Sequence, residues 1–178
     1  MKKILIVIAF IILILVISKS NNDYYVIPND AIRLRIVANS NSNYDQFIKM
    51  KVRDNLEEVL SNNISMKDSI DDARISIKNN LNTYEKVVSE TLNNYDYEEK
   101  FKINFGYNYF PKKEYKGVIY EEGMYESLLV TIGEGQGDNW WCVLFPPICS
   151  LEVDESYVND VEYRFYIKDM FDKYLKKN

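Results

Sequence analysis

Apolar residues recur along the chain with two different periods, and the changes of period divide it into strands and helices. At residues 32–36 (IRLRI) apolar and basic positions alternate, which is typical of a half-buried strand. A polar turn cluster follows at residues 39–42. Beyond it, apolar residues recur every three or four positions over 48–60 and again over 70–92. This spacing predicts two amphipathic helices.

Period two returns in the second half of the chain. Residues 101–109 alternate as one strand, residues 115–120 and 125–132 read as a hairpin, and residues 139–145 read as a further strand. A last helical pattern covers 161–174. The order of elements predicts one α+β domain with a mostly antiparallel sheet and three helices.

The N-terminus predicts export. Lys2 and Lys3 precede an apolar run over residues 4–17, and small residues follow at Ser18 and Ser20. As a helix the run is about 21 Å long, shorter than the hydrocarbon core of about 30 Å. Residues 1–20 are therefore expected to be a signal peptide or a short membrane anchor, and 4–17 would be the membrane contact if the segment stays. Residues 21–31 are expected to be a linker, and 32–178 the exported domain.

Composition excludes several classes of function. The 178 residues carry a net charge of −5, which disfavours binding to nucleic acid. The chain contains no histidine, so the Ser-His and Cys-His pairs of many hydrolases cannot form. With two cysteines it also lacks the ligands of a structural zinc site. We expect no catalytic residue, no cofactor and no metal.

The glycine-rich segment 133–138 (GEGQGD) is the first candidate for chemistry. Phosphate-binding glycine loops precede a helix, whereas this one precedes a predicted strand, so a sharp or mobile connection is the favoured interpretation. Glu134, Asp138 and Asn139 offer only three ligands to a calcium ion. Glu126 and Asp138 could form a distant glycosidase pair, but no spacing supports it.

The cysteines and tryptophans leave alternatives open. Cys142 and Cys149 are either bridged, if Pro146 and Pro147 turn the chain, or remain two separately buried thiols. Trp140 and Trp141 are neighbours on a strand, so one is expected to face the core and the other outward. The outward ring would be an interface anchor, unless both rings are structural.

Several segments resemble one family. Residues 31–42 (AIRLRIVANSNS) are similar to the opening motif of the stage II sporulation protein R family, and Asp45, Gln46 and 51–54 (KVRD) fit the helix that follows. Residues 133–147 (GEGQGDNWWCVLFPP) resemble its most distinctive segment. Residues 125–128 (YESL) and 161–165 (VEYRF) also fit, and the resemblance covers about residues 27–175.

This resemblance implies a non-enzymatic signalling protein of endospore formation. Such a protein is made in the forespore and exported into the space between the forespore and mother-cell membranes. There it triggers a membrane-embedded aspartic protease of the mother cell, the stage II sporulation protein GA. That protease then cleaves the precursor of sigma factor E.

The receptor contact is predicted on the segment from the glycine loop to the two prolines, with two arginines of the first strand nearby. A carbohydrate-binding or carbohydrate-active domain outside the cytoplasm is the alternative, and a membrane-anchored structural protein is a third reading. The predicted contact residues are Arg33, Arg35, Gly133, Gly135, Gly137, Asp138, Asn139, Trp140, Trp141, Pro146 and Pro147.

Overall fold

A computed structural model describes residues 25–27, 29–64, 67–115, 118–149 and 160–175. The predicted signal or anchor, residues 1–20, lies outside them. Within the described ranges, none of the helices has the length and apolar character needed to cross a membrane.

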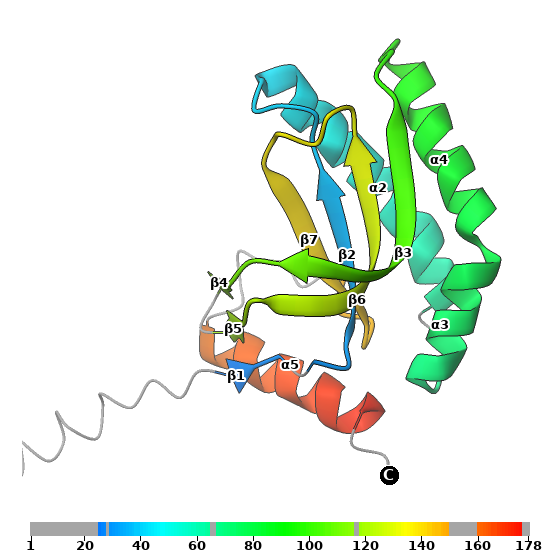
Figure 1. Cartoon of the computed structure of the whole chain (residues 1–178). Helices are drawn as coiled ribbons and strands as arrows, with labels where there is room; N and C mark the ends of the chain where they lie inside the picture. Colours follow the sequence, from blue (N-terminus) through cyan, green and yellow to red (C-terminus); the bar gives the residue numbers. More distant parts are fainter. Residues whose placement is uncertain (1–24, 28, 65–66, 116–117, 150–159, 176–178) are drawn as a thin grey trace, which may run out of the picture.

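A four-stranded sheet forms the centre of the molecule (Figure 1). Its strand order is β3 (Phe101–Phe110), β6 (Gly123–Ile132), β2 (Ile32–Val37) and β7 (Asn139–Phe145). The pair β2–β6 is parallel and the other two pairs are antiparallel. A smaller sheet has the order β1 (Tyr25–Val26), β5 (Val118–Tyr120) and β4 (Lys113–Tyr115). The α+β class with a mostly antiparallel sheet is confirmed.

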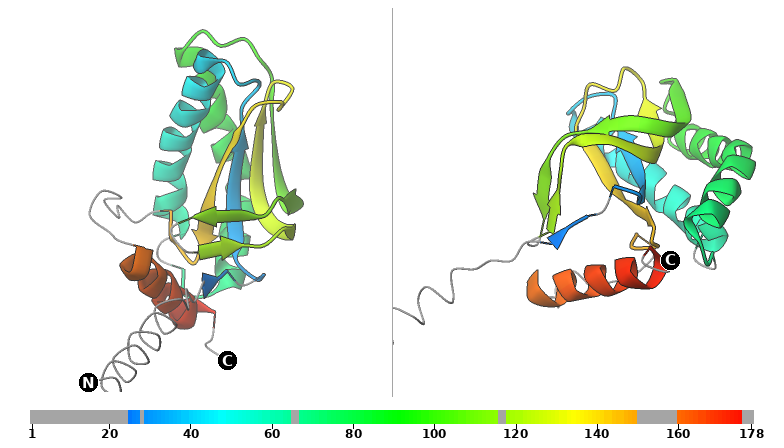
Figure 2. Two further views of the ribbon diagram at one scale, coloured as in Figure 1. Left: turned by 90° about the vertical axis from the view of Figure 1, so that its left-hand side faces the viewer. Right: turned by 60° about the horizontal axis from the view of Figure 1, so that its bottom comes forward.

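Three helices cover one face of the central sheet, and a fourth lies beside the small sheet (Figures 1 and 2). The first three are α2 (Asn43–Ile64), α3 (Ile70–Asn79) and α4 (Leu81–Asn94), and the fourth is α5 (Asp160–Tyr174). The described residues thus hold four helices rather than three, because the predicted 70–92 helix is interrupted at Asn80. The backbone of Asn80 is not helical, and its side-chain amide donates to the carbonyl of Ser76.

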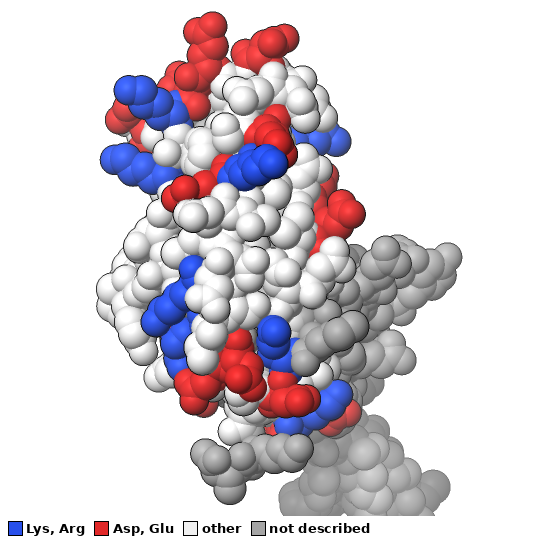
Figure 3. Space-filling view, turned by 90° about the vertical axis from the view of Figure 1, so that its right-hand side faces the viewer, with Lys and Arg blue, Asp and Glu red and all other residues white. Residues whose placement is uncertain are grey.

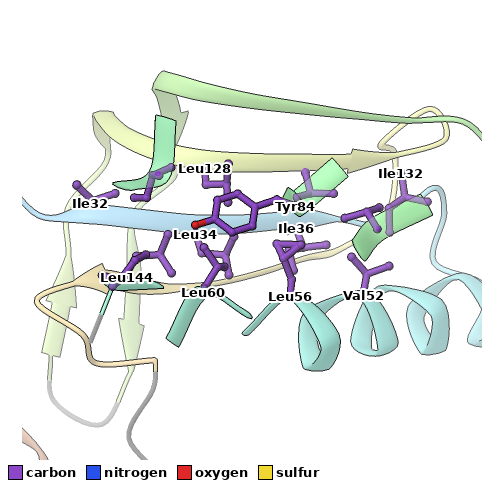
Figure 4. Close-up of a cluster of buried hydrophobic side chains, with 14 of the residues drawn as sticks. Ile32, Leu34, Ile36, Val52, Leu56, Leu60, Tyr84, Leu128, Ile132 and Leu144 are labelled. Carbon is purple, nitrogen blue, oxygen red and sulfur yellow. The ribbon is translucent and has the colours of Figure 1, made fainter. Parts of the chain in front are cut away.

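The core between the helices and the sheet is apolar (Figure 4). Strand β2 contributes every second residue to it, and α2 contributes a stripe at helical spacing. Each fully buried aliphatic side chain stabilises the fold by about 1.5–3 kcal/mol. The labelled members are Ile32, Leu34, Ile36, Val52, Leu56, Leu60, Tyr84, Leu128, Ile132 and Leu144.

The outer face of the helices carries mixed charge. Seen from the side of α3 and α4, acidic and basic side chains gather near the two ends of the molecule, with a broad uncharged area between them (Figure 3). The described part of this face therefore has no large patch of a single sign.

The predicted hairpin of residues 115–120 and 125–132 is wrong. Strand β6 pairs instead with β3 along their whole length, from Phe101 with Ile132 to Phe110 with Gly123. Strand β5 pairs with β4 and β1. The residues around Glu121 therefore continue a long two-stranded ribbon without reversing the chain, and this ribbon extends past the central sheet, because β6 pairs with β2 only from Ser127 onward.

The predicted linker also needs correction, because part of residues 21–31 belongs to the fold. It supplies β1, and the side chains of Ile27 and Ala31 are buried. They lie in a second core cluster, between the small sheet, β7 and α5. Its buried members are Ile27, Ala31, Val118, Tyr120, Val143, Ile148, Ile167 and Phe171.

Candidate partner-binding site

The ladder between β2 and β7 brings the two predicted groups of contact residues together. Arg33 pairs with Val143, Arg35 with Trp141 and Val37 with Asn139. The glycine loop lies at one end of β7 and the two prolines at the other, about 23 Å apart for seven residues of strand. The predicted contact residues are therefore distributed along the length of β7 and do not form one small patch.

The glycine loop is held against the segment that follows β2. Four backbone N–H groups of the loop donate hydrogen bonds to oxygen atoms of residues 38–41. The pairs are Glu134 to Asn39 Oδ1 (2.9 Å), Gln136 to Asn39 O (3.0 Å), Gly137 to Ala38 O (2.9 Å) and Asp138 to Asn41 Oδ1 (2.6 Å). Of the two interpretations, a sharp or a mobile connection, the geometry favours the sharp one, because the backbone donors of the loop are bound along most of its length.

Close packing explains the glycines of this loop. Gly133 has a φ of 56°, and a β-carbon there would collide with the side chain of Asn39. A β-carbon on Gly137 would collide with the backbone carbonyl of Ser40. These residues are glycine because the two segments approach too closely for a side chain. They shape the site and present no side chain to a partner.

A buried carboxylate, Asp45, fixes the segment on which the loop rests. It accepts hydrogen bonds from Ser40 Oγ (2.5 Å), Asn39 Nδ2 (3.2 Å) and the hydroxyl of Tyr97 (2.7 Å). The bond from Ser40, with that from Tyr97, lowers the pKa of Asp45. Burial and the same carboxylate raise the pKa of Tyr97. The sequence pattern offered Asp45 only as part of a helix and gave no sign of Tyr97.

A buried lysine of α2 completes this support. Lys49 Nζ donates to the backbone carbonyl of Asp138 (3.1 Å) and to Gln46 Oε1 (2.5 Å). Desolvation lowers its pKa. The carbonyl of Asp138 is thus bound while its side chain is exposed, like those of Glu134 and Gln136. The loop combines a bound backbone with three exposed polar side chains.

Exposed aromatic rings lie at the start of α2, which follows the segment that holds the loop. Tyr44 and Phe47 are 51% and 42% exposed and stack with centroids 6.3 Å apart. The hydroxyl of Tyr44 donates to the carbonyl of Tyr95 (2.8 Å), and Phe47 meets the ring of Tyr95 edge-on. Sequence reasoning missed this pair because both residues precede the helical pattern predicted over residues 48–60.

Arg33 differs most from its predicted environment. The alternation of apolar and basic residues predicts a half-buried strand, but Arg33 is completely buried. Its Cζ lies 3.3 Å from the ring centroid of Tyr125, 5.4 Å from that of Phe110 and 5.6 Å from that of Trp141. Desolvation lowers its pKa, an effect that Tyr125 partly offsets.

Arg35 lies on the same side of β2 and is half-buried. Its Nη1 donates to the carbonyl of Tyr109 (2.7 Å), and its Cζ lies 5.6 Å from the centroid of Phe110. Desolvation lowers its pKa as well. The two arginines therefore share one aromatic ring, and this aromatic environment is where the structure places the predicted basic contact.

The two tryptophans point to opposite sides of the sheet. Trp140 lies on the helix side under the guanidinium of Arg53, at 5.5 Å. Trp141 lies on the other side but is not a free ring, because it meets Tyr120 at 4.4 Å and Phe110 at 5.8 Å, both edge-on. Both tryptophans are half-buried, so neither ring projects freely into solvent.

The far end of β7 is a closed turn. The structure joins Cys142 and Cys149 by a disulfide, with Cα atoms 5.8 Å apart. Pro146 and Pro147 are buried there, and the peptide bond before Pro146 is cis. The N–H of Cys149 donates to the carbonyl of Val143 (3.1 Å). These prolines shape the turn and offer little surface.

Two other candidate sites gain no support from the geometry. No group of acidic or cysteine residues in the described ranges could hold a metal ion. Glu126 is bound by Arg74, with Nε–Oε1 and Nη2–Oε2 distances of 2.7 Å, at the start of β6. Asp138 lies in the loop beyond the other end of that strand, so the two carboxylates do not face each other.

Comparisons with known proteins give one family. The family described as stage II sporulation protein R matches residues 28–155. The stage II sporulation protein R of Bacillus subtilis (strain 168) is 40% identical over 135 residues, which are 76% of this chain and 60% of that protein. The chain thus spans about 60% of the length of this relative. No solved structure matches the chain.

Proposed function

The chain belongs to the stage II sporulation protein R family, and on that premise we propose that it is an exported signal of endospore formation. Membership of the family assigns the chain to sporulation. The proposal adds a compartment and a partner. The chain leaves the forespore and activates the membrane-embedded aspartic protease of the mother cell, the stage II sporulation protein GA. Cleavage of the sigma factor E precursor follows.

Activation requires differential affinity for two states of the protease. A ligand shifts an equilibrium only by binding one state more tightly than the other. Stabilising a productive dimer of the protease would satisfy this condition. The signal itself then needs no catalytic group, and the family name carries no enzymatic activity.

The rigid glycine loop supports the proposal most directly. Its backbone is bound by residues 38–41 and by Lys49, while the side chains of Glu134, Gln136 and Asp138 are exposed. A loop with a prearranged backbone loses little backbone entropy when it binds, so only the ordering of its polar side chains opposes their contacts with a partner. We place the receptor contact at these three side chains.

Reconstitution in a non-sporulating host tests the function. The host carries the protease and a tagged precursor of sigma factor E, and precursor cleavage is followed by immunoblot. The exported chain should cause cleavage, and a version without residues 1–20 should not. Absence of cleavage, with a competent protease and a folded chain, would reject the function and bring carbohydrate binding forward.

Substitution of the loop tests the contact surface. Asp138→Ala combined with Glu134→Ala should reduce cleavage at least tenfold, because both exposed carboxylates are removed while the bound backbone is kept. Glu85→Ala, an exposed carboxylate on α4, is the matched control and should leave cleavage unchanged. Full cleavage with the folded double variant would exclude the loop as the contact.

A further inference from the structure

Arg33 and Arg35 place two guanidinium groups on the side of β2 that α2, α3 and α4 do not cover. Both approach the ring of Phe110, at 5.4 and 5.6 Å from its centroid. Lys113 Nζ lies 5.4 Å from the centroid of Trp141, the ring that Arg33 also contacts. Three cations thus gather around two aromatic rings in a chain of net charge −5.

Most of the donors in this group are unused. Nε, Nη1 and Nη2 of Arg33 and Nε of Arg35 are buried and have no hydrogen-bond partner. Among the described residues, neither arginine takes part in a salt bridge. Burying a charge without a counter-ion is costly, and cation–π contacts of about 2 kcal/mol offset only part of the cost. An anionic ligand would remove this penalty.

The surroundings of Arg33 select the kind of anion. The ring of Tyr125, 3.3 Å away, covers one face of the guanidinium, so the donors that remain point outward in its plane. A planar carboxylate accepts two such N–H groups side by side. A phosphate can accept the same two N–H groups, but it is more strongly hydrated than a carboxylate, so transferring it into this buried aromatic environment costs more free energy.

We propose that Arg33 and Arg35 form a binding site for one carboxylate group, supplied by an acidic side chain of a partner protein. The identity of that partner rests on the proposed function, but binding of a carboxylate does not. Arg35 is half-buried and marks the entrance, whereas Arg33 is the inner and fully desolvated donor.

The small sheet is the element that must move to admit the ligand. Tyr120 of β5 covers Trp141 with ring centroids 4.4 Å apart, beside Arg33. Strand β5 pairs with β1 over two residues and with β4 over three. Few ladder hydrogen bonds are therefore lost when it moves, although the buried side chains of Val118 and Tyr120 must separate from the second core cluster. The carboxylate meets Arg35 first and reaches Arg33 when this sheet moves away.

Thermal unfolding of the full chain tests the site, with sodium acetate as the probe and sodium chloride at equal ionic strength as the reference. Acetate at ten times its Kd should raise the Tm of the wild type by about 3–5 °C relative to chloride. Arg33→Met should lose this rise. Arg53→Met is the matched control, because Arg53 also stacks on a tryptophan but already pairs with Asp54, and it should keep the rise.

A second measurement keeps the proposal testable if Arg33→Met fails to fold. Acetate should shift the indole N–H resonance of Trp141 in a two-dimensional NMR spectrum and leave that of Trp140 in place. Equal Tm rises in wild type and Arg33→Met, or unchanged indole resonances, would overturn the site. Tighter binding of phosphate than of acetate would overturn the choice of carboxylate. Acetate binding without signalling would reject the proposed function and leave the site intact.

Discussion

The two sides of strand β2 are built from alternate residues of one short sequence, and they differ in what they bury. Ile32, Leu34 and Ile36 enter an apolar core closed by three helices. Arg33 and Arg35 enter an aromatic environment closed by the small sheet and β7. On the first side every buried apolar side chain stabilises the fold. The second side buries the positive charge of arginine, which the described residues do not neutralise. The structure thus assigns stability to one side of the strand, and our proposal assigns recognition to the other.

The two tryptophans repeat this contrast on the neighbouring strand. Trp140 meets Arg53, which pairs with Asp54 and is partly exposed. Trp141 meets Arg33, which is buried and unpaired in the described structure. The same pair of residue types therefore gives an ordinary surface contact on one side and an unsatisfied group on the other.

The largest expected effect comes from the helix side. Leu34→Ala should lower the free energy of unfolding by about 3–4 kcal/mol, because it leaves a cavity in a fully buried core. Leu129→Ala removes the same atoms from a half-buried position in β6, on the opposite face of the central sheet. It should lower the free energy of unfolding by about 1 kcal/mol. Urea denaturation of the two variants measures the difference. Equal losses would show that the two sides contribute alike to stability.

The next largest loss of stability is expected at the glycine loop, which lies at one end of β7. Gly137→Ala should cost about 2 kcal/mol, because its β-carbon collides with the backbone of Ser40. Gly106→Ala is the matched control, since no atom lies within 4 Å of a β-carbon at that position in β3. It should change stability by less than about 0.5 kcal/mol. If Gly137→Ala is equally neutral in urea denaturation, the loop is not held as described.

The smallest effect is a dependence on pH. Because hydrogen bonds lower the pKa of Asp45 in the folded state, its contribution is present above the unfolded value of about 3.9. It is lost as the pH falls through the lower folded value. Asp45→Asn should cost about 1 kcal/mol at neutral pH and flatten the fall in stability below pH 4. If stability falls as steeply below pH 4 in the variant as in the wild type, Asp45 is not the source of that fall.

Periodicity predicted most elements of the fold but not their pairing. The strands at 101–109 and 139–145 and the helix at 48–60 follow from local patterns, and the structure has them as β3, β7 and α2. The hairpin at 115–132 was wrong because turn residues such as Glu121 and Gly123 can continue a ribbon as well as reverse the chain. The local pattern of a strand does not determine which other strand pairs with it.

The environment of Arg33 could not be predicted for a related reason. A charged residue in an alternating strand is normally exposed, so the pattern indicated solvent. The rings that bury it, from Phe110 and Tyr125, are far along the chain and reach it only through the long ribbon. The role of the glycines in the loop could not be predicted for the same reason, because the segment they approach ends almost a hundred residues earlier in the chain.

We propose that the unsatisfied charge of Arg33 serves recognition at the expense of stability. Arg33→Met and Arg53→Met are compared in the reconstituted host for precursor cleavage, and in urea for stability. Arg33→Met is expected to be as stable as the wild type, or more stable by about 1–2 kcal/mol, and to lose at least tenfold in precursor cleavage. Arg53→Met should keep its cleavage. Full cleavage by a stable Arg33→Met protein would show that Arg33 does not serve recognition.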